Sequence, residues 1–528
     1  MVQKRIGCLS LSLAALLAGC AVGPDFAPPP APEVKGYTPE PLAAKTAAAA
    51  VPGGAAQSFV AGMDIPGQWW TLFHSEALNG LVEQALKANP SLQAAQAALR
   101  QAMENVYAQE GFYFPTIQAS ASPSRQQNTN TLAPTLNSGQ PIFSLYTAQL
   151  AVSYTPDVFG ANKRAVESLL AQADAQRFQL EATYLTLSSN VVAAALQEAG
   201  LRAQIAATQE VIKIESEQLA ILQRQYGLGS ISMADVAAQQ ATLAQIQATL
   251  PPLQKQLAIQ RDLLSALTGR FPSQEPAERF ELSGLQLPLE LPVSLPSKLV
   301  EQRPDVQAAE ANMHSASAEI GVAIANELPQ LTLTASAGST ATKLANLFAS
   351  GTGFWILAGN VAQTVFDGGT LLHKRRAADA ALDQAAAQYR SAVISAFQNV
   401  ADSLRALQFD ADALKANAAA ERAAADSLDI QRSQLRLGAI SYLSLLTAEQ
   451  AYQQAIINRV QAQTNRYADT AALFQALGGG WWNRNDSVMK SADATIPSDH
   501  AAAAMPVAEA SNNGDRGFFS VVSRTLGF

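Results

Sequence analysis

Apolar residues recur along the chain with two different periods, one helical and one of two residues. From Leu180 to Tyr226 they follow a 4-3 spacing, which is typical of the seam of a coiled coil. Three polar residues interrupt this seam, Glu198, Thr208 and Glu215. A less strict seam extends over residues 370–437. We predict long helices at residues 161–227 and 370–437, the first about 100 Å long at 1.5 Å per residue.

Two shorter segments, residues 115–124 and 329–338, alternate between apolar and polar side chains and are therefore predicted to be strands. Each begins at a proline, Pro115 or Pro329, which forces the residue before it out of the helical region. A second strand is expected after each, at residues 143–158 and, less regularly, at 353–366. One apolar face per strand is also compatible with a half-buried sheet of a soluble protein, but no other segment resembles the layer that would cover it.

An internal duplication organises these elements. The residues Asn89-Pro90-Ser91-Leu92-Gln93-Ala94-Ala95 correspond to Arg303-Pro304-Asp305-Val306-Gln307-Ala308-Ala309 at an offset of 214, and Phe114-Pro115 corresponds to Leu328-Pro329 at the same offset. Two landmarks at one spacing indicate a repeat. We therefore expect one repeat at residues 67–285 and a second at residues 286–480, the latter opening with a helix at 296–326. Pro90 and Pro304 suit the first turn of a helix, with Asn89 as a cap.

The long helices are expected to end at two matched turns. Gly229-Ser230-Ile231-Ser232 corresponds to Gly438-Ala439-Ile440-Ser441 at an offset of 209. Each glycine can adopt the left-handed conformation that ends a helix, and each serine can cap the next one. Ser232 and Asp235 have the spacing of a capping box. Returning helices are predicted at residues 232–267 and 441–477, so that each repeat contains one helical hairpin.

The N-terminus is typical of an exported lipoprotein. Residues 1–19 combine Lys4 and Arg5 with an apolar stretch that is too short to span a membrane, as in a signal peptide. Leu17-Ala18-Gly19-Cys20 resembles a bacterial lipobox, in which the cysteine becomes the acylated N-terminus; an ordinary cleavage site followed by an incidental cysteine is the alternative. Ala21, where lipoproteins retained in the inner membrane usually have Asp, implies delivery to the outer membrane. Residues 20–66 are rich in Pro and Ala and are expected to form an extended tether.

Composition excludes several classes of function. The apolar fraction is 48%, yet after the N-terminus no run is long enough for a membrane-spanning helix, so a spanning part would have to consist of strands. Without the signal peptide, 33 basic residues stand against 43 acidic ones, a net charge of −10 that disfavours a nucleic-acid partner. The four histidines are scattered and no phosphate-binding or nucleophile motif occurs, so we expect no metal, no cofactor and no enzymatic activity. Residues 481–528 are irregular.

These landmarks together resemble the TolC-like outer-membrane efflux protein family, and specifically its lipoprotein (NodT-type) branch, which serves resistance-nodulation-division (RND) tripartite efflux pumps. The resemblance covers residues 17 to about 482. Besides the lipobox, it rests on Trp69-Trp70-x-x-Phe73, Arg303-Pro304-Asp305-Val306-x-Ala308-Ala309-Glu310-Ala311, Leu328-Pro329-x-Leu331-x-Leu333, Phe366-Asp367-Gly368-Gly369 and Leu437-Gly438-x-x-Ser441-Tyr442-Leu443.

The resemblance implies a mixed α/β membrane protein with two structural repeats, each a strand pair plus long coiled-coil helices. Three chains would form a 12-stranded β-barrel continued by a 12-helix α-barrel. The implied function is a passive outer-membrane exit duct, lipid-anchored through Cys20. Its partners would be a periplasmic adapter (membrane fusion) protein and an inner-membrane RND transporter. The hairpin turns would contact the adapter and close the resting duct, with the site residues Gly229, Ser232, Asp235, Gly438, Ser441, Leu443, Ser444 and Thr447.

One departure from the family pattern concerns the constriction. Family members often have Asp at the positions that match Ser444 and Thr447, so a carboxylate ring at that level is in doubt here. We hypothesise that Asp235 supplies one charge per subunit instead and favours cations. In the alternative interpretation Asp235 only completes its capping box.

Two other classes of protein share some of these features. A periplasmic adapter lipoprotein also contains a coiled-coil hairpin, but it has a single hairpin flanked by β-rich domains. An exported enzyme, or a structural coiled-coil lipoprotein, is disfavoured by the missing site chemistry and by the regular strand pairs, respectively. The sequence does not identify the transported solute.

Overall fold

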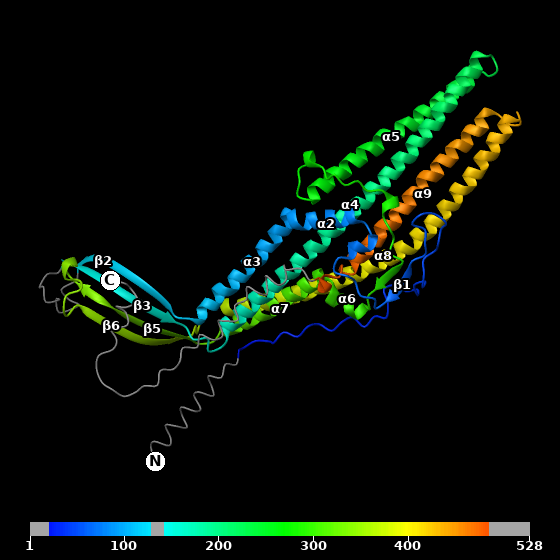
Figure 1. Ribbon diagram of the computed structural model, residues 1–528. Coiled ribbons are helices and arrows are strands. Elements are labelled where there is room, and N and C mark those ends of the chain that lie inside the picture. The colour runs from blue at the N-terminus through cyan, green and yellow to red at the C-terminus, as the bar shows by residue number, and fades with distance from the viewer. Residues whose placement is uncertain (1–20, 128–141, 485–528) are drawn as a thin grey trace. The chain divides into compact units, whose positions relative to one another are not determined.

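A computed structural model of the 528-residue chain describes residues 21–127 and 142–484. The predicted signal peptide, Cys20 and the tail after residue 484 lie outside the described residues. The main elements of the part described are two helical hairpins and one four-stranded sheet. Figure 1 shows how they are arranged.

The two hairpins have the same dimensions. In the first, α4 (Ala161–Gly227) packs against α5 (Met233–Leu267), and in the second, α8 (Thr370–Arg436) packs against α9 (Tyr442–Ala476). Both first helices have 67 residues and both returning helices have 35. The hairpins also contact each other, chiefly through α4 and α9 (Figure 1).

Shorter helices precede each strand pair. α2 (Glu76–Ala88) leads into α3 (Pro90–Glu110), which packs on α4, and α6 (Pro296–Gln302) leads into α7 (Pro304–Ala325), which packs on α4 and α8. The expectation of one continuous helix over residues 296–326 was wrong. Arg303 is extended, with φ −91° and ψ 119°, because the ring of Pro304 excludes the helical conformation from the residue before it. Asn89 caps α3 by accepting a hydrogen bond from the Ser91 amide.

The large sheet is antiparallel with the strand order β2-β3-β5-β6. Its strands are β2 (Thr116–Gln127), β3 (Ile142–Tyr154), β5 (Gln330–Ala341) and β6 (Gly353–Ala362). Ile117, Val152, Ala335 and Leu357 form one row across all four strands, and Gln118, Ala151, Ser336 and Ile356 form the next. Because directly paired residues share a face, the first row belongs to the apolar face of β2, β3 and β5, and the second to the face rich in Ser, Thr and Gln.

Two strands are shorter at their C-terminal ends than the expected 143–158 and 353–366. β3 ends at Tyr154 and β6 at Ala362. In each connection an aspartate carboxylate accepts hydrogen bonds from backbone amides at the start of the following helix. Asp157 accepts hydrogen bonds from the amides of Asn162 (3.0 Å) and Lys163 (2.8 Å), and Asp367 accepts from Gly369 and Leu371 (both 2.8 Å).

The predicted tether contributes to the packed core, which its composition did not indicate. β1 (Ser58–Ala61) pairs in parallel with β4 (Glu290–Val293) from the connection between the two strand-and-hairpin units. Arg466 of α9 is fully buried and donates to the carbonyl of Ala55 at 2.6 Å. The segment that leads away from the N-terminus is therefore fastened to the helical body.

Aromatic residues occupy the centre of that body. Trp69, Trp70 and Phe73 are almost completely buried, and the ring of Trp69 stacks on Phe474 of α9 at 5.5 Å. Trp481 donates from its indole nitrogen to the carbonyl of Gln302 at 2.8 Å. Within the described residues, no helix is long and apolar enough to cross a membrane.

Candidate functional site at the hairpin ends

The two hairpin turns have the same backbone geometry. Gly229 and Gly438 both have a φ of +71°, the left-handed conformation predicted from their positions. The amide after each glycine bonds back into the last helical turn, Ser230 to the carbonyl of Gln225 at 3.0 Å and Ala439 to that of Gln434 at 2.9 Å. A side chain at either glycine would meet open space, so it is the backbone conformation that calls for glycine.

The returning helices begin with the predicted caps. Ser232 accepts a hydrogen bond from the amide of Asp235, whose carboxylate accepts from the amide (3.1 Å) and the hydroxyl (2.7 Å) of Ser232. Ser441 accepts from the amide of Ser444 at 3.4 Å. Thr447 donates its hydroxyl to the carbonyl of Leu443 at 3.0 Å. Asp235 therefore completes the predicted capping box. These hydrogen bonds do not depend on whether Asp235 also affects ion selectivity.

Large apolar side chains are exposed at both turns. Leu228 is 85% exposed, Leu437 83% and Leu443 65%. Exposed leucines grouped around a tight turn are typical of an interaction surface, because isolated chains otherwise tend to bury such area.

A buried polar cluster connects the hairpins beneath these turns. Glu215 of α4 and Gln239 of α5 are almost fully buried. The side-chain amide of Gln239 donates to a carboxylate oxygen of Glu215 at 2.6 Å, and Gln453 of α9 donates to the other oxygen at 2.8 Å. Tyr442, at the start of α9, donates its hydroxyl to the side-chain oxygen of Gln239 at 2.7 Å. One carboxylate therefore holds α4, α5 and α9 together.

Glu449 adds a second buried carboxyl group to this cluster. It is 4% exposed, one of its oxygens has no hydrogen-bond partner, and the other lies 3.7 Å from the guanidinium of Arg432. Burial and the nearby charge of Glu215 raise the pKa of Glu449 to about 7, although Arg432 acts in the opposite direction. Burial also raises the pKa of Glu215, against the two amide hydrogen bonds that lower it.

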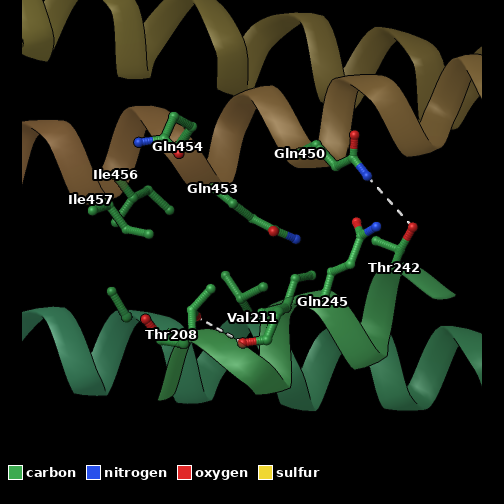
Figure 2. Close-up of a pocket in the computed structure, with 12 residues that line it drawn as sticks. Thr208, Val211, Thr242, Gln245, Gln450, Gln453, Gln454, Ile456 and Ile457 are labelled. Carbon is green, nitrogen blue, oxygen red and sulfur yellow. Dashed lines mark hydrogen bonds between the residues drawn. The ribbon is translucent and has the colours of Figure 1, made fainter. Parts of the chain in front are cut away.

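A cavity of about 250 Å³ lies between the hairpins next to this cluster. Its walls come from α4, α5 and α9, and Figure 2 shows side chains from both hairpins facing the space. Gln450 reaches across it to the hydroxyl of Thr242 at 3.5 Å (Figure 2). The lining is mixed, with several glutamines beside Val211, Ile246, Ile456 and Ile457. Because the cavity is not filled by interlocking side chains, the hairpins have room to shift here.

On α4, closer to its N-terminus than the cavity, the hairpins pack tightly. A Cβ atom at Gly200 would lie 2.4 Å from the hydroxyl of Thr464 on α9, so the two helices can approach this closely only with glycine at that position. Gln204 donates to the side chain of Gln461 at 2.9 Å. The contact between α4 and α9 thus has a close-packed part, a cavity and a polar cluster.

The buried polar cluster was missed as a site by sequence reasoning, although a signal for it was present. The three interruptions of the α4 seam, Glu198, Thr208 and Glu215, are all buried. Glu198 pairs with Arg202 and Arg261, and Thr208 bonds within its own helix. A polar residue at a seam position therefore marked a buried contact rather than an error in the pattern.

The described residues contain no group of histidine, cysteine or carboxylate side chains that could hold a metal ion. The predicted acylation site, Cys20, lies outside the described residues.

The fold is that of outer-membrane efflux channels. A solved structure of the MtrE outer membrane channel of Neisseria gonorrhoeae in its open state aligns with a TM-score of 0.74 and 26% identity, over 88% of this chain and 100% of that chain. A sequence model of the outer membrane efflux protein family matches residues 81–270 and 295–479, and the chain belongs to this family.

Two relatives align over nearly their whole length. The toluene efflux pump outer membrane protein TtgC of Pseudomonas putida is 30% identical, over 93% of this chain and 99% of its own. The probable outer membrane lipoprotein SilC of Salmonella typhimurium is 27% identical, over 90% of this chain and 99% of its own. The protein is an outer-membrane efflux channel component of a tripartite pump, which confirms that prediction. The alternative of a periplasmic adapter is not supported.

Proposed function

We propose that three copies of the chain close a 12-stranded barrel in the outer membrane and continue it as a 12-helix tunnel in the periplasm. The observation that carries this proposal is the four-stranded sheet, whose outer strands β2 and β6 each have one edge without a strand partner among the described residues. Four strands are too few for a membrane barrel, which needs about eight or more, and an open edge is not stable in lipid. Three sheets joined edge to edge remove both problems.

Acylated Cys20 would anchor the chain where the strands meet the helices. The residues directly after it support this placement. Val22 donates its amide to the carbonyl of Phe159 at 3.1 Å, and Arg164 of α4 pairs with Asp25 at 2.7 Å. A Cβ at Gly160 would lie 2.7 Å from Ala21, so the anchor segment is seated directly on the start of α4. Residues 20–66 then form the tether, and residues 67–285 and 286–480 form the two repeats.

The hairpin turns would dock on a periplasmic adapter, with the exposed leucines 228, 437 and 443 supplying apolar contact area. An inner-membrane RND transporter would supply the energy, since the duct itself is passive and catalyses no reaction. The relative TtgC is described as a toluene efflux protein. For this chain we propose export of drugs or other small solutes, with the choice among them made in the transporter.

The polar cluster of Glu215, Gln239, Glu449 and Gln453 would hold the hairpin ends together in the resting duct. It joins α4 and α5 to α9 at the level where the turns narrow the tunnel, beside a cavity that leaves room for movement. Releasing it would let one hairpin move away from the other and widen the opening.

The test is to purify the acylated protein in lipid nanodiscs, measure its mass, and record its conductance in planar bilayers. We expect particles with three chains and discrete ion-conducting steps. Particles with a single chain that pass no current would overturn the proposal.

A further inference from the structure

The most unusual chemistry outside the turns is the pair of buried carboxyl groups contributed by different hairpins. Glu215 is 1% exposed and Glu449 is 4% exposed, and the charge of Glu215 adds to burial in raising the pKa of Glu449. Glu215 has two amide donors, whereas Glu449 has a distant guanidinium and an oxygen without a partner. Two buried carboxylates this poorly compensated are not both ionised at low cost.

We propose that Glu215 and Glu449 form a proton-operated latch that holds the two hairpins together when it carries one proton and loosens when that proton is lost. This proposal rests on the proposed function, because it specifies how the resting duct is opened and closed.

The charged and titratable groups near Glu449 come from several helices. Glu215 on α4 and Arg432 on α8 act on Glu449 directly, and Tyr442 on α9 lies within reach of its charge. Asp235 on α5 acts on Tyr442, and Asp429 on α8 pairs with Arg432. Arg432 is shared, since it lies 3.8 Å from Asp429 as well as 3.7 Å from Glu449. A single shared guanidinium does not neutralise two buried carboxylates, so a proton completes the charge balance.

The direction of the effect follows from where the proton binds more tightly. With the hairpins together, the pKa of Glu449 is about 7, and with the hairpins apart the carboxyl meets water and returns to the ordinary value of 4.5. Protons therefore favour the closed arrangement. Closure is strongest below about pH 4.5, weakens as the pH rises towards 7, and is weakest above that value. Acidification of the periplasm would close the duct, and neutral or alkaline conditions would prepare it to open.

The surrounding packing suits a latch. Gly200 and Thr464 lock α4 to α9 on one side of the cavity, and the carboxyl pair lies on the other side, towards the turns. A hairpin fixed at the tight contact can pivot there, because the cavity between the two contacts yields more readily than a packed core. When the contacts of Glu215 and Glu449 are lost, the hairpin can rotate about the tight contact and its turn can move.

The experiment uses the full chain in lipid nanodiscs and measures two quantities against pH. Infrared spectroscopy detects the protonated carboxyl group directly. Spin labels at Lys213→Cys on α4 and Ala451→Cys on α9, both exposed positions, report the distance between the hairpins when labelled chains are diluted into unlabelled ones. We expect a carboxyl signal that titrates near pH 7 and is missing from Glu449→Gln, and a distance that increases over the same range, with the closed-to-open ratio falling about tenfold or more.

Three variants and a control define the outcome. Glu449→Gln keeps the size without the charge, so the labels should stay close at every pH. Arg432→Gln should raise the pKa of Glu449, because it removes the positive charge that stabilises the carboxylate. Glu215→Gln should lower the pKa of Glu449, because it removes a negative charge that repels the carboxylate. Glu217→Gln, an exposed neighbour on α4, should behave like the unmodified chain.

The latch is wrong if the distance does not depend on pH, or if Glu449→Gln leaves the dependence intact. Should Glu449→Gln not fold, the opposite shifts of the other two variants decide the same question. Planar-bilayer currents keep the two proposals apart. A distance that titrates in a protein without current contradicts the channel assembly and supports the latch, whereas a current with a distance indifferent to pH does the reverse.

Discussion

At the scale of single residues, buried polar side chains distinguish the contacts between helices from ordinary coiled-coil packing. Glu198, Glu215 and Glu449 are all less than 5% exposed, and each has partners on a second helix. Such groups rarely add net stability, because burying a charge costs about as much as its pairing returns. Their presence therefore favours a role in specifying, or in switching, the contact between the hairpins.

Asp410 gives a residue-scale prediction that is independent of the latch. Burial and its neighbour Asp469 raise the pKa of Asp410 to about 7, partly offset by Arg466. In the unfolded chain this carboxyl group would lose its proton near pH 3.8. The folded state binds the proton more tightly, so its stability falls as the pH rises from 3.8 to about 7. We expect Asp410→Asn to stabilise the protein above pH 7 by about 1 kcal/mol, a value reduced for its partial exposure to solvent. Thermal unfolding at several pH values measures this, with exposed Asp412→Asn as the control; equal gains for both variants would contradict it.

At the scale of elements, the same short signals produce the same structures twice. A glycine with a φ of +71°, followed three residues later by a capping serine, ends each long helix and starts each returning one. The second hairpin lacks the carboxylate that completes the box in the first, because Ser444 stands where Asp235 stands in the first. The turns are therefore alike in backbone but differ in charge.

This difference makes the ion selectivity of the hairpin ends testable. Asp235→Asn removes one charge per subunit, and we expect the preference for cations to weaken, so that the reversal potential in a salt gradient moves towards zero. Ser232→Ala is the matched control, since it breaks the capping box at a cost of about 1 kcal/mol but keeps the carboxylate. An unchanged reversal potential in Asp235→Asn would leave capping as the role of this residue.

At the scale of the whole molecule, the proposed trimer requires a sheet with one face suited to lipid and one suited to water. The apolar face of the sheet exposes Trp355, Leu357 and Val361 of β6 at 74%, 71% and 68%. The opposite face presents mainly small and polar side chains from β2, β3 and β5. A sheet with one such face towards lipid and the other towards water has no need of a covering layer.

Adjacent residues of β6 test this orientation. Leu357 pairs with Ala335 on the apolar face, and Ile356 pairs with Ser336 on the polar face. We expect Leu357→Lys to destabilise the assembled barrel by about 2–4 kcal/mol, since the lysine would meet lipid. Ile356→Lys should assemble normally and alter the conductance instead. Trimer resistance to detergent and single-channel recordings measure the two effects; comparable loss of trimer in both variants would contradict the assigned faces.

The sequence by itself determined the elements and the family. Hydrophobic period, the prolines at residues 115 and 329, and the paired glycine turns act over a few neighbouring residues, so they can be read without coordinates. Helix and strand ends were less predictable. Pro304 divided one expected helix, and β3 and β6 each ended four residues before the predicted position. Gly229 and Gly438, predicted from the matched pattern to end the long helices, lie where the turns form.

Only the tertiary structure brought Glu215 and Glu449 together, because they are more than 200 residues apart and their helices belong to different hairpins. The same holds for Arg466, which binds the tether through Ala55, and for Gly200 against Thr464. A seam pattern records that a position is buried, but it does not record which helix covers it. The partners of a buried charge, and hence its pKa, depend on how the hairpins pack, and that is decided by the folded chain as a whole.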